Sequence, residues 1–146
     1  MNVLHNGDVT ALASQAELCA FILRCPPAEA QRVVVEAERL GVDPIDMCAR
    51  RLGLGEHLVM ERAARWAGVD YDAMMPQTIR GSARQLRLDS LATTRTIHAD
   101  VDGESRYYLA PGIADVLALR SAVRRGGLRH RIVLTPRVAL RRARRQ

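Results

Sequence analysis

Residues 97–110 read IHADVDGESRYYLA. This stretch decides the fold class because its apolar residues recur with a different period from those of the preceding chain. Apolar and polar residues alternate from Ile97 to Val101, which is the period of a β-strand with one buried face. An Asp-Gly pair at 102–103 follows, and such a pair readily adopts the two positive φ angles of a tight turn. The sequence therefore predicts a β-hairpin whose second strand covers 105–110.

The residues after the hairpin predict a helix, a strand and a last helix. Apolar side chains recur at helical spacing over 113–123, and two glycines follow shortly after. The segment 131–134 (RIVL) is typical of a short buried strand, so strand, helix and strand imply a right-handed parallel crossover. We expect Thr135 to cap the last helix, with Pro136 at its first position. Residues 91–146 are thus predicted to form a small β-β-α-β-α lobe with an arginine-rich C-terminal helix.

The first half of the chain predicts four short helices, which would form a helical lobe over residues 1–75. The breaks between and after these helices are prolines and glycines, namely Pro26-Pro27, Gly41, Gly53 and Gly68. Asp43 followed by Pro44 predicts a helix N-cap with proline at the first helical position. Residues 76–90 have no sustained period and hold several turn formers, so we expect a linker there. The predicted fold class is α+β, with the helical lobe preceding the smaller lobe.

Charge is distributed unevenly along the chain. All 22 basic residues are arginine, and the formal net charge is +6. Residues 1–115 carry 12 Arg against 16 Asp and Glu, whereas 116–146 carry 10 Arg and no acid. The absence of lysine is typical of a GC-rich genome rather than of selection for phosphate recognition, which argues against nucleic acid as a partner. The terminal run would contact phosphates or anionic lipid heads through charge alone, and its members are Arg141, Arg142, Arg144 and Arg145. A solvated helix end explains the same run.

No cluster of residues in the sequence predicts a reaction. A phosphate-binding loop needs a third glycine and a lysine, which the stretch 53–55 (GLG) lacks. No serine has the flanks of the Gly-x-Ser-x-Gly turn, and the four histidines are too scattered to place two metal ligands on one helix face. Cys19, Cys25 and Cys48 include no Cys-x-x-Cys pair, so we expect buried reduced thiols. We therefore predict no catalytic residue, no cofactor and no metal ligand.

The apolar stretches are short. The longest, such as 33–35 and 132–134, fall far below the roughly 20 residues that span a bilayer. The N-terminus lacks the basic start and following apolar block of a secretory signal, so we expect a cytoplasmic location.

Three stretches, 41–44 (GVDP), 52–56 (LGLGE) and 63–71 (AARWAGVDY), together with the order of elements, resemble the N-terminal domain of type II secretion ATPases. The form that the chain is most similar to precedes family 2 glycosyltransferases in some proteobacteria, where RIVLTP at 131–136 ends the module. The resemblance covers roughly residues 28–143. It implies a helical lobe followed by a small α/β lobe, and a docking or regulatory role at the inner face of the bacterial inner membrane.

Some members of that family bind cyclic di-GMP through a motif that opens with Arg-Leu-Gly, and Arg39 and Arg51 each begin this tripeptide here. The resemblance therefore implies these two arginines as nucleotide-binding residues. The glycine expected nine residues after each arginine is Cys48 or Met60, however, and no closing glutamine follows. These departures from the motif argue against cyclic di-GMP. Both arginines also suit an ordinary helix C-terminus, where a cation stabilises the helix dipole.

The sequence favours a non-catalytic interaction or regulatory module, whose partner is a protein or a catalytic domain in the same polypeptide. We expect the helical lobe to present the partner surface. Three alternatives stay open: a free-standing basic protein that binds nucleic acid, a cyclic di-GMP-binding regulatory domain, and an enzyme of unrecognised type. A helix ending in arginines also suits a chain that approaches a first transmembrane segment from the cytoplasmic side, so the sequence leaves open whether Gln146 is the natural end.

Overall fold

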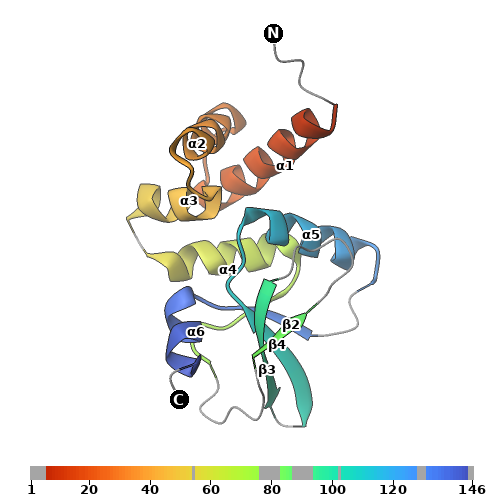
Figure 1. Ribbon diagram of the computed structural model, residues 1–146. Helices are drawn as coiled ribbons and strands as arrows, with labels where there is room; N and C mark the ends of the chain where they lie inside the picture. Colours follow the sequence, from red (N-terminus) through yellow and green to blue (C-terminus); the bar gives the residue numbers. More distant parts are fainter. Residues whose placement is uncertain are drawn as a thin grey trace.

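The computed structural model describes residues 6–53, 55–75, 83–86, 94–101, 103–127 and 131–144. The helices that come first are α1 (Asn6–Leu23), α2 (Pro27–Leu40), α3 (Pro44–Leu52) and α4 (Glu56–Ala67). The elements that follow are β1 (Asp70–Tyr71), β2 (Ala83–Leu86), β3 (Thr94–Val101), β4 (Glu104–Leu109), α5 (Ile113–Arg124), β5 (Arg131–Leu134) and α6 (Arg137–Arg144). The fold is therefore α+β, with helices preceding strands, and this confirms the prediction (Figure 1).

The strands of the described residues form a five-stranded sheet in the order β1-β5-β4-β3-β2. β3 and β4 are the predicted hairpin, paired antiparallel with Ile97 opposite Tyr108. β4 and β5 are parallel, with Tyr108 opposite Val133, and α5 connects them as the predicted crossover. Asp102 of the predicted turn lies outside the described residues, while Gly103 has a φ of 79°.

The two outer strands were not predicted. β1 pairs parallel with β5, and β2 pairs antiparallel with β3. β2 lies inside 76–90, the segment expected to be a linker, and the rest of that segment is outside the described residues. Strands of two and four residues are too short to show a period, so only pairing with a remote strand defines them.

The helix boundaries follow the predicted caps in the first half of the chain. The Oδ1 atom of Asp43 accepts a hydrogen bond of 2.9 Å from the backbone N of Ile45, and Pro44 begins α3. Gly41 and Gly68 follow α2 and α4 with φ angles of 66° and 82°. These left-handed conformations suit glycine because it lacks a Cβ atom, so each helix ends where the glycine stands.

The predicted cap of α6 is wrong. Thr135 is fully buried, and its Oγ1 atom has no hydrogen-bond partner among the described residues. The carbonyl of Pro136 instead accepts the first helical bonds, from the backbone N atoms of Ala139 and Leu140. The N-terminus of the helix is capped from a distance, because Oε1 of Glu56 accepts a 2.9 Å hydrogen bond from the N of Arg137.

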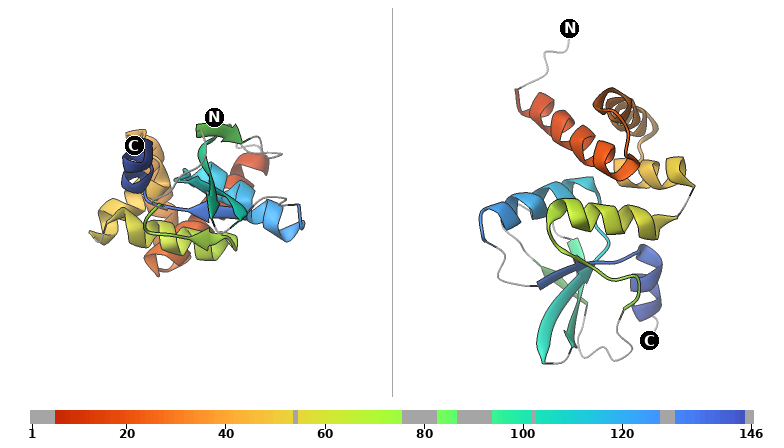
Figure 2. Two further views of the ribbon diagram at one scale, coloured as in Figure 1. Left: turned by 90° about the horizontal axis from the view of Figure 1, so that it is seen from below. Right: turned by 180° about the vertical axis from the view of Figure 1, so that it is seen from behind.

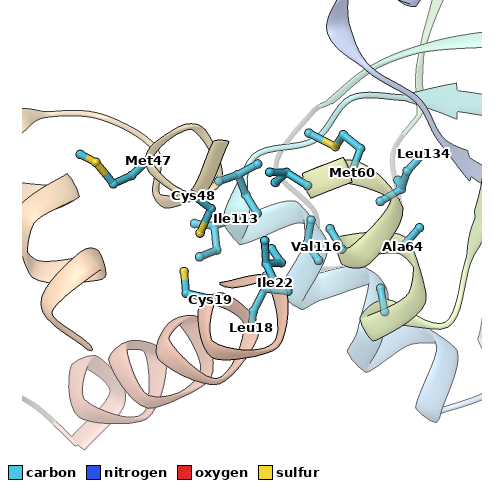
Figure 3. Packing of buried hydrophobic residues seen from close by; sticks show 14 of the residues in the cluster. Leu18, Cys19, Ile22, Met47, Cys48, Met60, Ala64, Ile113, Val116 and Leu134 are labelled. Atoms are coloured by element: carbon cyan, nitrogen blue, oxygen red, sulfur yellow. The ribbon is translucent and has the colours of Figure 1, made fainter. Parts of the chain in front are cut away.

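A single hydrophobic core joins the helices to one face of the sheet. Figure 3 shows Leu18 and Ile22 of α1 packing with Met60 and Ala64 of α4 and with Ile113 and Val116 of α5. β5 contributes to both sides of the sheet, since Ile132 and Leu134 belong to this core and Val133 belongs to a second cluster. The second cluster also holds Leu140 of α6, which therefore covers the opposite face of the sheet.

The helices on the side of the sheet away from α6 form two layers. The views of Figures 1 and 2 show α4 and α5 side by side, between the layer of α1, α2 and α3 and the sheet. The predicted helical lobe thus packs on the predicted α/β lobe through the shared core. Among the helices that the structure describes, none combines the length and the apolar character needed to cross a lipid bilayer.

Candidate functional site

The outer face of α1 and α2 carries a hollow of about 660 Å³, which we call the α1–α2 hollow. Its lining includes apolar Leu12 and Val35 and polar Gln31, Arg32, Glu36 and Arg39. The sequence of α2 explains this face, because the buried side of the helix is already occupied by Ala30, Val33, Val34 and Ala37. Val35 therefore points away from the core, and 53% of its surface is exposed.

The polar lining of the α1–α2 hollow leaves an excess of positive charge. Glu36 is compensated from α3, since its Oε2 atom lies 3.3 Å from Nη2 of Arg51. Arg32 and Arg39 are exposed and have no ion-pair partner among the residues that the structure describes. The hollow thus combines apolar side chains with two cations that remain available to a partner.

The two arginines named by the family resemblance have different surroundings. Arg39 lines the α1–α2 hollow, whereas Arg51 of α3 is held by Glu36. A phosphate at Arg51 would have to displace that carboxylate. Both side chains of this ion pair are exposed, so displacing the carboxylate would cost little energy.

The C-terminal arginines also divide into two kinds. Arg141 and Arg142 are exposed on α6, and neither has an ion-pair partner within the described part of the chain. Arg144 ends the helix, and Arg145 lies outside the described residues. Arg137 is different, because its guanidinium lies 3.1 Å from Oδ1 of Asp46. The first arginine of α6 is therefore a structural contact, and the next two face solvent.

A histidine, an aspartate and a serine meet on the hairpin, which the sequence analysis did not foresee. His98 Nε2 hydrogen-bonds with Ser105 Oγ and lies 3.6 Å from Asp100 Oδ1, and the ring stacks on Tyr107 with centroids 4.8 Å apart. Strand register brings them together, since His98 is opposite Tyr107 and Asp100 is opposite Ser105. In a catalytic triad the serine and the carboxylate engage different ring nitrogens. Here both engage Nε2, so the arrangement is not that of a triad.

Two of the three cysteines are fully buried, as predicted. Cys19 and Cys48 face each other in Figure 3, and the pKa of Cys48 is raised by a hydrogen bond with Cys19 and by burial. A raised pKa keeps the thiol protonated and makes it a poor nucleophile. Cys25 is partly exposed, contrary to the prediction, and burial together with Glu29 raises its pKa.

Metal-binding side chains do not cluster in the described ranges, where no three His, Cys, Asp or Glu residues converge on one point. Comparison with known proteins gives no match to any protein-family model, to any curated protein or to any solved structure.

Proposed function

We propose that this chain is a non-catalytic interaction or regulatory module, and that the α1–α2 hollow is its docking surface. The observation that supports the proposal is the pairing of exposed Val35 with uncompensated Arg32 and Arg39 on one face. Such a face fits an amphipathic helix that places an aliphatic side chain on Val35 and acidic side chains beside the arginines. The partner is either a separate protein or a catalytic domain in the same polypeptide.

A second large aliphatic side chain of α2 is also exposed, although it does not line the hollow. Leu40, the last residue of α2, is 49% exposed, so two large aliphatic side chains of one helix face water. Covering the exposed half of a valine contributes on the order of 1 kcal/mol, since complete burial contributes about twice as much. The buried side of α2 is already filled, so folding of this chain alone does not require either side chain to be apolar.

We further propose that the module works at the cytoplasmic face of a bacterial inner membrane, beside a membrane-bound glycosyltransferase or a secretion ATPase. Arg141 and Arg142 support this placement, because exposed arginines attract anionic lipid heads by about 1 kcal/mol each. In Figure 1, α6 lies beside the sheet, in the half of the molecule away from α1 and α2. A membrane on the α6 side would leave the α1–α2 hollow open to the cytoplasm.

Site-specific photo-crosslinking in the source cell tests the docking surface. A benzophenone amino acid at position 35 is expected to capture one partner protein, or a following domain of the same polypeptide. Position 138 provides the matched control, because Val138 is 52% exposed and belongs to α6, which does not line the hollow.

A binding measurement with the purified partner completes this test. Val35→Asp is expected to weaken binding about tenfold or more, as for a central interface residue, and Val138→Asp to leave it unchanged. Equal crosslinking at both positions, or equal effects of the two substitutions, would contradict the proposed surface.

A further inference from the structure

We propose that a second hollow, between the C-terminal end of α1 and one side of α4, binds a nucleoside monophosphate. This α1–α4 hollow has a volume of about 420 Å³ and is lined by Ala20, Phe21, Arg24, Arg62 and Arg65. Its volume falls in the range of small-molecule sites, which is about 300–1,000 Å³. It shares no lining residue with the α1–α2 hollow, so the two proposals are independent.

Positive charge dominates the α1–α4 hollow. Three of its five lining residues are arginines. Among the described residues, only Arg65 of these three has a carboxylate partner, Glu61, at 4.0 Å. Both members of that pair are exposed, so solvent screens it. Arg24 is exposed and has no ion-pair partner among the described residues. Guanidinium groups that surround a hollow without a matching number of carboxylates favour an anionic ligand.

Arg62 is already held in position. Its Nη1 atom donates a hydrogen bond to the carbonyl oxygen of Ile22, so the side chain is fixed against the end of α1. A guanidinium fixed in this way loses less conformational entropy when a ligand binds. Phosphate and carboxylate are the anions that match the planar fork of an arginine, because they accept two parallel hydrogen bonds.

Arg24 stands at a position that favours glycine. Its φ of 54° lies in the left-handed region, directly after α1. A non-glycine residue in this conformation costs roughly 1 kcal/mol, and helices commonly end with glycine there. An arginine at this position therefore carries a conformational cost, which a role for its side chain in the hollow would account for.

Phe21 supplies a planar apolar surface beside the arginines. The Phe21 residue is 40% exposed, although α1 buries Leu18 and Ile22 in the core. Aromatic rings stack on other planar rings, and a purine or pyrimidine base offers such a ring on the same molecule as a phosphate. The combination of one exposed aromatic ring with three guanidinium groups thus selects a phosphate ester with a planar base, rather than a simple anion.

Titration of the isotope-labelled chain with AMP, adenosine and inorganic phosphate tests the proposal by NMR. AMP is expected to shift the backbone amides of residues 20–24 and 62–65, with a dissociation constant below about 1 mM. Adenosine and inorganic phosphate are each expected to bind at least tenfold more weakly, because each lacks half of the recognised chemistry. Equal affinity of either one with AMP would overturn the proposal, as would the absence of shifts at these amides.

Substitutions separate binding from folding. Arg24→Gly and Arg65→Gln are each expected to weaken AMP binding about tenfold, the loss of one charge-assisted contact. Arg24→Gly should also preserve or raise the thermal stability, because glycine tolerates the positive φ. Arg32→Gln in the α1–α2 hollow is the matched control and should bind AMP as the unmodified chain does. Unchanged affinity in Arg24→Gly would show that the arginine only ends the helix.

Discussion

Asp43 and Gly112 approach so closely that a Cβ atom on Gly112 would lie 2.6 Å from Oδ2 of Asp43. The same carboxylate caps two helices, since Oδ1 accepts from the N of Ile45 at 2.9 Å and both oxygens lie 3.2 Å from the N of Ile113. One side chain therefore holds the N-termini of α3 and α5, which belong to the two halves of the chain. This contact fixes the helical half on the sheet half at one point.

Gly112→Ala is expected to destabilise the protein by about 1–3 kcal/mol, because the new methyl group would push against the carboxylate of Asp43. The φ of Gly112 is −80°, so backbone strain is not the cause. Urea unfolding measures the change in free energy. Gly127→Ala is the control, since a Cβ atom there would meet its nearest neighbour at 3.9 Å, an ordinary contact. Equal effects of the two substitutions would contradict the steric explanation.

Arg137→Gln is expected to loosen α6 without unfolding the rest of the chain. The guanidinium lies 3.1 Å from Asp46 and 3.8 Å from Glu56, so it connects α6 to α3 and α4. These side chains are partly exposed, so solvent screens the ion pairs and the loss is expected to stay near 1 kcal/mol. Hydrogen exchange of the α6 amides should become about fivefold faster. Arg141→Gln, on the solvent side of the same helix, should leave exchange unchanged.

Replacement of both Arg141 and Arg142 by glutamine is expected to weaken binding to vesicles of phosphatidylglycerol and phosphatidylcholine. Two lost arginine contacts amount to about 2 kcal/mol, or roughly 30-fold in affinity. Vesicle sedimentation at low salt measures the change. The matched control replaces Arg32 and Arg39, which have the same charge and belong to α2, a helix that lies away from α6 (Figure 1). An equal loss in the control would show that only net charge matters.

Arg131→Gln is expected to raise the pKa of Glu104 towards its ordinary value of 4.5. A hydrogen bond from Arg131 is the main cause that lowers this pKa in the folded chain, and Arg106 contributes less. Because the folded-state pKa is lowered, the pair stabilises the protein above pH 4.5, and this contribution is lost as the pH falls through the folded-state pKa. Carbon-detected NMR of the Glu104 carboxyl measures the shift. Arg124→Gln, at the end of α5, should leave the titration of Glu104 unchanged.

Thr135→Val is expected to stabilise the protein by about 1 kcal/mol. The hydroxyl of Thr135 is fully buried and has no partner among the described residues, and such a group costs about 1–3 kcal/mol. Valine has nearly the same shape and no hydroxyl. Thermal unfolding compares this variant with Val133→Thr, which places a hydroxyl in the neighbouring cluster and should destabilise. A lower melting temperature for Thr135→Val would indicate that the hydroxyl is satisfied in solution.

Much of the fold could be predicted because its signals are local. The glycine after α4 has the left-handed φ that ends a helix, and Asp43 caps α3 from two residues away. The alternation of apolar and polar residues along one strand, together with the Asp-Gly pair, predicted the hairpin. The cap of α6 could not be predicted in this way, because Glu56 supplies it from 81 residues away.

The candidate sites were less accessible to sequence reasoning. Arg39 was named by resemblance, and the structure places it in the α1–α2 hollow. Arg24 gave no sequence signal and Phe21 only that of an apolar residue of the first helix, since their partners in the hollow stand about 40 residues later on α4. The hairpin cluster around His98 also depends on strand register, which alternation alone does not reveal.

The sequence by itself determined the helices, the three central strands and the α+β class, because caps, breakers and periodicity act over a few residues. Only the tertiary structure decided which arginines are neutralised and which remain available. Arg131 and Arg137 meet carboxylates 61 and 91 residues away, whereas Arg24 and Arg32 meet none among the described residues. An ion pair requires atoms within a few ångströms of each other, and for residues this far apart in sequence only the packing of the folded chain supplies that distance.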